Sequence, residues 1–99
     1  MKLLLPIDFT VASVNALQYA NDLVQDLGTG DICLLHIVGS DKEQALAHEQ
    51  LRDWAERHMP AGAPVEINVT VAKRVFDIIG SIANDCGASM VIMGTQGAK

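Results

Sequence analysis

The chain has 99 residues, 49% of them hydrophobic, which is enough for one globular domain, spanning residues 1–99, with its own core. Seven basic and twelve acidic residues give a formal net charge of −5 without a basic stripe, which excludes a protein that binds nucleic acid through phosphates. No apolar run is long enough to span a membrane or to form a signal-peptide core, so we expect a cytoplasmic protein whose buried thiols, Cys33 and Cys86, are reduced.

The first predicted elements are a buried strand and a helix. Lys2–Ile7 is a continuous apolar run, which indicates a strand covered on both faces. Pro6 must lie near its carboxyl end, because proline cannot donate to a central ladder. Apolar residues at helical spacing then predict a helix over Val11–Leu27, which Gly28 ends.

The middle of the chain repeats this alternation. Ile32–Val38 predicts a second buried strand, in which His36 is expected to be a hydrogen-bonded core residue. A helix is expected over Lys42–His58, with Ala47, Leu51, Trp54 and His58 on one face, followed by a loop rich in proline and glycine. Val65–Val71 alternates strictly between apolar and polar residues, which indicates a half-exposed strand.

The last elements complete an alternating α/β order. A helix is expected over Val75–Cys86 and a fourth apolar strand over Ser89–Met93. Such an order predicts a three-layer α/β/α arrangement, in which a mostly parallel, doubly wound sheet forms the middle layer. Because the alternating strand belongs at an edge, the strand order should be 3-2-1-4. The fourth strand then forms an apolar edge, which indicates that a fifth strand is missing or that another chain supplies it.

In this order the winding reverses between the first and fourth strands, which is where such sheets bind ligands. Asp8 ends the first strand and Gly94 begins a glycine turn, Gly94–Gly97, after the fourth. Such a turn lets backbone N–H groups approach an anion, although an ordinary connection fits equally well. Asp8 could accept hydrogen bonds from a ribose or a base, or could simply stabilise a helix that either Thr10 or Ser13 caps.

Other motifs are absent. The first turn carries neither the dinucleotide-binding glycine pattern nor a P-loop, and the histidines lack metal-ligand spacing. No Ser/His/Asp or Cys/His set can be assembled, and Lys73–Arg74 fits a solvated basic pair better than an anion site. We therefore expect a binding protein that is not a dedicated enzyme.

Together these features resemble the universal stress protein family. Four segments carry the resemblance and match the family's opening strand, first helix, second strand and the start of its nucleotide motif, in order: Leu4–Thr10, Ala16–Ala20, Leu34–Val38 and Val91–Gly97. The resemblance implies a five-stranded parallel sheet, a homodimer formed through the fifth strand, and a site for ATP or another adenine nucleotide, with or without Mg²⁺.

The resemblance also implies which residues bind the nucleotide: Pro6, Ile7, Asp8, Thr10, Val38, Met93, Gly94 and Gly97. The backbone near Pro6 and the Asp8 side chain would face the adenosine, and Val38 would contact the adenine. Met93 would lie beside the base or ribose, with Gly94 and Gly97 at the phosphates.

The sequence departs from the family pattern after Gly97. The second half of the phosphate motif, the last helix and the fifth strand are absent, and Lys73–Arg74 stands where many members carry a glycine. The leading hypothesis is a stress-response sensor or binding module for an adenine nucleotide. The alternatives are a nucleotide-independent interaction or dimerisation module of the same fold and, with less support, a slow ATPase.

Overall fold

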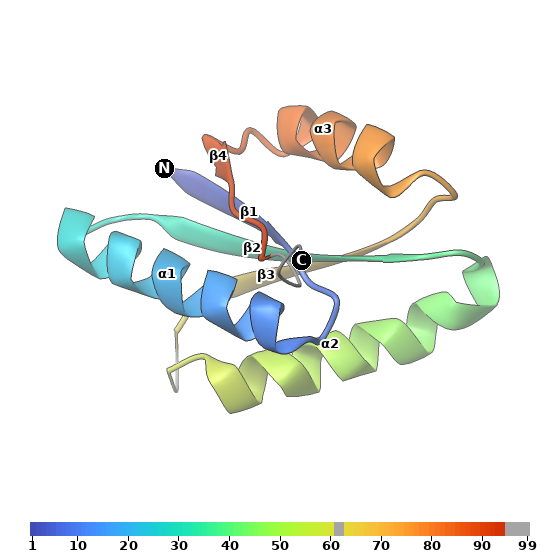
Figure 1. The fold of residues 1–99 in the computed structure, drawn as a ribbon, viewed down its shortest axis with the longest axis horizontal. Coiled ribbons are helices and arrows are strands. Elements are labelled where there is room, and N and C mark those ends of the chain that lie inside the picture. The colour runs from blue at the N-terminus through green and yellow to red at the C-terminus, as the bar shows by residue number, and fades with distance from the viewer. Residues whose placement is uncertain (61–62, 95–99) are drawn as a thin grey trace, which may run out of the picture.

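The computed structural model of the chain describes residues 1–60 and 63–94, and Figure 1 shows how their helices and strands are arranged. The elements alternate as the sequence predicts, with one short 3-10 turn, η1, ahead of the second helix. In chain order they are β1 (Lys2–Pro6), α1 (Val11–Leu27), β2 (Asp31–Val38), η1 (Asp41–Glu43), α2 (Gln44–His58), β3 (Val65–Val71), α3 (Val75–Asp85) and β4 (Met90–Val91).

The strands form a four-stranded parallel sheet in the order β3-β2-β1-β4, which confirms the predicted order. β2 pairs with β1 over residues 31–35 and with β3 over residues 32–38. β4 pairs with β1 at Leu3↔Met90 and Leu4↔Val91 alone. The direction of winding therefore reverses between β1 and β4.

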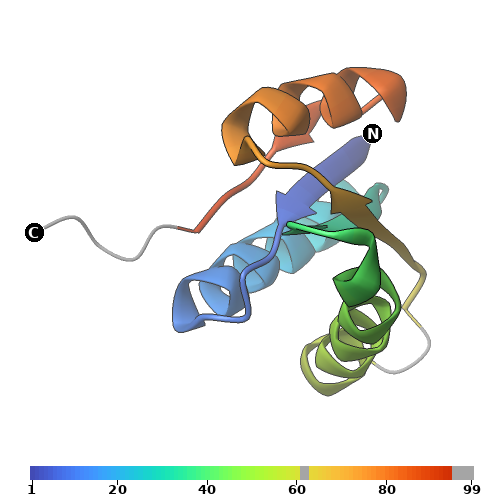
Figure 2. The ribbon, with the colours of Figure 1, turned by 90° about the vertical axis from the view of Figure 1, so that its right-hand side faces the viewer.

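Helices cover both faces of the sheet, as Figure 2 shows: α3 lies on one side, and α1 and α2 lie on the other. Alternate residues of β1 divide between the two layers. Leu3, Leu5 and Ile7 pack with α1 and α2, whereas Leu4 packs with Cys33 and Ile79 beneath α3. Since each fully buried leucine contributes about 1.5–3 kcal/mol, the two cores hold the three layers together.

The ends of α1 follow from local backbone chemistry. Thr10 precedes the helix in an extended conformation, which is the usual geometry of an N-cap residue. Gly28 follows it in the left-handed region at φ 73°, and its N–H donates to the Gln25 carbonyl. A side chain is strained in this conformation, so glycine is the residue that ends the helix with least cost.

The structure corrects several expected details. β4 is two residues long, shorter than the expected Ser89–Met93; the Ser89 and Ile92 N–H groups on either side still bond to β1 carbonyls, at 2.8 and 2.9 Å. In α2, Ala55 is buried and His58 is exposed, with its ring against Trp54. The buried face of α2 therefore ends at Trp54 and Ala55 and does not extend to His58.

Two further observations bear on expectations from the sequence. Within the described part of the chain, no helix has the length and apolar character needed to cross a bilayer. Both cysteines are free: Cys33 is buried as expected, and Cys86 is only half-buried.

Candidate functional site

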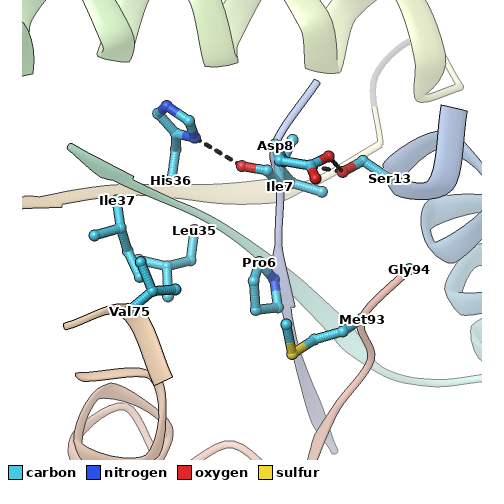
Figure 3. Close-up of a pocket in the computed structure, with 10 residues that line it drawn as sticks. All are labelled: Pro6, Ile7, Asp8, Ser13, Leu35, His36, Ile37, Val75, Met93 and Gly94. Atoms are coloured by element: carbon cyan, nitrogen blue, oxygen red, sulfur yellow. Dashed lines mark hydrogen bonds between the residues drawn. The ribbon is translucent and has the colours of Figure 1, made fainter. Parts of the chain in front are cut away.

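A cavity of about 510 Å³ opens at the carboxyl ends of β1 and β2, beside the segment that follows β4. It therefore lies where the winding of the sheet reverses, which is the usual ligand position in doubly wound sheets. Figure 3 shows the residues that line it: Pro6, Ile7, Asp8, Ser13, Leu35, His36, Ile37, Val75, Met93 and Gly94. Its volume falls within the range of small-molecule sites, about 300–1,000 Å³.

Apolar side chains form most of the wall. Pro6 and Leu35 pair across β1 and β2, and Figure 3 shows them with Ile37 on the same side of the sheet. Val75, the first residue of α3, and Met93, which follows β4, complete this surface. Walls of this kind suit the flat faces of an aromatic ring system.

Asp8 supplies the carboxylate of the cavity. Its Oδ1 accepts three hydrogen bonds, from the Thr10 N–H at 3.0 Å, the Thr10 hydroxyl at 2.5 Å and the Ser13 hydroxyl at 2.6 Å. The Ser13 hydroxyl lowers the pKa of Asp8, and Thr10 adds to the effect, because these bonds stabilise the charged form. Within residues 1–60 and 63–94, no donor bonds to Oδ2.

Ser13 also fixes the backbone of this turn. Its oxygen accepts a hydrogen bond from the Asp8 N–H at 2.9 Å while its proton is donated to Asp8 Oδ1. Ser13 is only 3% exposed and belongs to the first turn of α1. Both the main chain and the side chain of Asp8 are therefore attached to the helix.

Phe9 holds an unusual backbone conformation between Asp8 and α1. Its φ is 66°, a left-handed value that is rare for a bulky residue. Its ring lies 4.6 Å from that of His36 and 6.5 Å from that of Trp54, and Trp54 in turn lies 4.8 Å from His58. This aromatic row, His36–Phe9–Trp54–His58, supports a strained turn, and such strain clusters at functional sites.

His36 bonds to the main chain at the end of β1. Its Nδ1 lies 2.7 Å from the Ile7 carbonyl oxygen, and because a carbonyl only accepts, Nδ1 must carry the proton (Figure 3). This confirms the hydrogen-bonded histidine expected in the second strand. The bond joins β2 to the residue that precedes Asp8.

Gly94 closes the cavity against the first turn of α1. A Cβ atom at this position would lie 1.9 Å from the Ala12 carbonyl oxygen and 2.4 Å from its carbonyl carbon. These are backbone atoms of a helix and cannot rotate away. Only glycine therefore allows the segment after β4 to lie this close to α1.

The structure brings together most of the residues that the sequence singled out. Those lining the cavity are Pro6, Ile7, Asp8, Met93 and Gly94. Thr10 lies beside them through its bonds to Asp8, and Gly97 lies outside the described residues. Val38 is buried among the residues that pack with α1 and α2 and is not among those that line the cavity, whereas its neighbour Ile37 is.

The sequence prediction missed several lining residues. Leu35 and Ile37 could have been found from strand periodicity, because alternate residues of a strand face the same side. Val75 opens a helix next to the predicted ligand position, and Ser13 was considered only as a helix cap. No local pattern shows that the Ser13 hydroxyl returns to Asp8.

Positive charge lies near the cavity but not in its described wall. No lysine or arginine of the described residues lines it. Lys73 and Arg74 precede Val75 and are exposed, and Arg74 pairs with Asp77 at 3.7 Å. Residues 1–60 and 63–94 also contain no group of three or more His, Cys, Asp or Glu that could hold a metal ion.

Solved structures match this chain over nearly its whole length. Protein Rv1636 from Mycobacterium tuberculosis H37Rv gives a TM-score of 0.77 at 21% identity, covering 99% of this chain and 73% of that one. A protein of the universal stress protein family from Burkholderia pseudomallei gives 0.68 at 20% identity, over 95% and 80% of the two chains. The universal stress protein from Archaeoglobus fulgidus gives 0.74 at 18% identity, over 97% and 77%.

The chain has the universal stress protein fold. Models of protein families and the sequences of curated proteins give no match, so the likeness rests on structure. Within the universal stress protein fold, this chain places an apolar cavity wall and a hydrogen-bonded carboxylate at the same position, the reversal of winding.

Proposed function

We propose that this protein binds an adenine nucleotide in the cavity between β1, β2 and the segment after β4. One observation carries the proposal: Pro6, Asp8 and Met93, which the family resemblance assigned to the adenosine, come from both ends of the chain and line a single cavity at the reversal of winding. Asp8 comes from the end of β1 and Met93 from beyond β4. An ordinary pair of connecting turns need not enclose a space of ligand size.

The lining fits the nucleoside part of such a ligand. The apolar surface of Pro6, Ile37 and Met93 suits the faces of a purine. Asp8 is an acceptor for ribose hydroxyls, because an ionised carboxylate only accepts hydrogen bonds. The described cavity therefore offers an apolar part and a hydrogen-bonding part, as a nucleoside requires.

The phosphate end is supported more weakly. The Gly94 backbone borders the cavity, and the second glycine of the turn is outside the described residues. The described residues offer no protein cage for Mg²⁺, so a metal would be held by the phosphates and water. A phosphate chain bound there would meet the Gly94 backbone and no lysine or arginine of the described wall, and we assign no residue a catalytic step.

The biological role follows from the fold by analogy alone. We propose a sensor or binding module in a stress response, acting in the cytoplasm, in line with the two solved proteins named for universal stress. The net charge of −5 fits a small-molecule ligand better than a nucleic acid.

Isothermal titration of the whole chain with ATP, with and without Mg²⁺, tests this proposal, with UTP as the mismatched base. We expect saturable heat for ATP. Met93→Ala should weaken binding, whereas Met90→Ala should not, although the two side chains are similarly exposed, at 42% and 45%. Met90 lies on β4 and does not line the cavity. Absence of heat with ATP at about 1 mM, a concentration matching a binding free energy of only about −4 kcal/mol, would refute the proposal.

A second function is favoured by the outer edge of the sheet. Met90 and Val91 form an exposed apolar edge on β4, which faces no further strand of the described chain. Such an edge pairs readily with another chain, so the protein can also serve as a dimerisation or interaction module. Sedimentation should show self-association that Val91→Lys abolishes; a monomer at high concentration contradicts this role.

A further inference from the structure

We propose that Ser13 is a positioning residue that sets the Asp8 carboxylate for a ribose diol, so that the cavity selects ribonucleosides over 2′-deoxyribonucleosides. This inference rests on the proposed nucleotide site and adds its sugar specificity. It concerns the part of the ligand that the described residues can contact, and it assigns a role to a serine that the family resemblance did not single out.

The hydrogen bonds on Asp8 are divided unequally between its oxygens. Thr10 and Ser13 give three donors to Oδ1 and, in the described chain, none to Oδ2. A carboxylate oxygen that accepts three donors has little capacity left, because the whole group offers about four lone-pair positions. Oδ2 is therefore the atom available to a ligand in the cavity that Asp8 lines.

The chemistry of that atom points to hydroxyl groups. An ionised carboxylate is an acceptor only, so it matches the O–H donors of a sugar and repels phosphate oxygens. The Ser13 hydroxyl, followed by Thr10, lowers the pKa of Asp8 and so favours this ionised form. A site built to hydrogen-bond a ligand hydroxyl discriminates strongly against the analogue that lacks it.

Ser13 can orient Asp8 because it is itself held firmly. It is 3% exposed and sits within the first turn of α1, with its hydroxyl bonded to the Asp8 N–H at 2.9 Å and to Oδ1 at 2.6 Å. These two bonds bridge the left-handed turn at Phe9. Thr10 is half-exposed, and both of its bonds to Asp8 are made to Oδ1, whereas Ser13 holds the Asp8 main chain as well.

A purely structural role for Ser13 predicts a different result. If its hydroxyl only stabilised the start of α1, its loss would lower the melting temperature and weaken all ligands by the same factor. If it positions Asp8, its loss changes the ratio of affinities between two sugars. The ratio therefore distinguishes the two roles.

The experiment measures dissociation constants for adenosine and 2′-deoxyadenosine, alongside ATP, with the whole chain. We expect the wild type to prefer adenosine by about tenfold, the effect of one hydrogen bond to a charged group. The preference should fall to about twofold or less in Asp8→Asn and in Ser13→Ala. In both variants the ribose hydroxyl loses its charge-assisted hydrogen bond, because the carboxylate is either removed or no longer held in place. The matched variants Asp26→Asn and Ser81→Ala, both exposed helix positions outside the cavity, should keep the wild-type preference.

The outcomes distinguish failure of the role proposed for Ser13 from failure of the proposed nucleotide binding. Equal binding of both sugars by the wild type, or an unchanged preference in Ser13→Ala, overturns the role of Ser13 and leaves the proposed function standing. Absence of binding to adenosine and ATP overturns both. If Ser13→Ala does not fold, the NMR signal of the Asp8 carboxyl carbon in the wild type decides: adenosine should shift it more than 2′-deoxyadenosine does, and equal shifts refute the proposal.

Discussion

The Gly94→Ala substitution should disable the cavity while leaving the fold intact. A Cβ atom at this position would lie 1.9 Å from the Ala12 carbonyl oxygen, against the 3.0 Å that real Cβ atoms keep. The segment after β4 must therefore move by about 1.1 Å, the difference between these two distances. A radial gap of about 0.5–1 Å already removes a quarter to a half of the attractive energy of a van der Waals contact, so a shift of this size weakens the contacts between the cavity wall and a ligand.

We expect Gly94→Ala to weaken nucleotide binding more than it destabilises the fold. The bonds that attach β4 to β1, from the Ser89 and Ile92 N–H groups, lie before Gly94 and need not break. We therefore expect a loss of stability of about 1 kcal/mol, which lowers the melting temperature by about 4–8 °C in a domain of this size. Nucleotide affinity should fall by at least about tenfold, because Met93 and Gly94 both move with the cavity wall.

Gly80→Ala is the matched control, since it makes the same chemical change inside α3. A Cβ atom there meets nothing within 4 Å. Alanine in a helix is favoured over glycine by about 0.5–1 kcal/mol, so this variant should melt about 2–8 °C higher and bind normally. Calorimetric titration and thermal melting of the three proteins are the assay. If Gly94→Ala binds within about twofold of the wild type, the contact with Ala12 does not shape the site.

Three further predictions concern the core, the turn and the buried thiol. Leu51→Ala should lower the free energy of unfolding by about 2–5 kcal/mol, and Leu46→Ala by less than about 0.5 kcal/mol, because Leu51 is 0% and Leu46 60% exposed; equal effects in guanidinium unfolding would contradict the face assigned to α2. The Ser13 hydroxyl lowers the folded-state pKa of Asp8, so Asp8 stabilises the fold above its unfolded pKa and the effect is lost as the pH falls through the folded value. Melting curves of Asp8→Asn should thus depend less on pH below about pH 5 than those of the wild type, and parallel curves would refute this. Burial raises the pKa of Cys33 to about 12, so iodoacetamide at neutral pH should label it only after unfolding, and rapid labelling of the folded protein would be the contrary result.

The parts of the fold that depend on local chemistry could be predicted from the sequence. The bounds of α1 follow from Thr10, the apolar stripe and Gly28, and the structure reproduces them. The strand order followed from a contrast in patterning, because only Val65–Val71 alternates. The length of β4 could not be predicted, since residues 90–93 are apolar throughout and none of them marks where pairing with β1 stops.

The site was predicted less completely, for two physical reasons. In a continuously apolar strand such as β2, residues on both faces are apolar, so apolar character alone does not mark Leu35 and Ile37 as cavity residues. Val38, the adenine contact that the family resemblance implies, is buried among the residues that pack with α1 and α2. The contacts of the turn depend on its backbone path. The left-handed conformation of Phe9 returns Asp8 to Ser13, and no propensity rule predicts that conformation for phenylalanine.

The aromatic row gives this protein an internal optical probe. Trp54 is the single tryptophan of the chain, and it lies edge-on to Phe9, the residue that follows Asp8. The centroid of its ring also lies 4.8 Å from that of His58 at the end of α2. Because Phe9 follows Asp8 directly, we expect a ligand bound to Asp8 to displace the Phe9 ring and so to alter the surroundings of the indole. Tryptophan emission should therefore follow occupancy of the cavity without any added label.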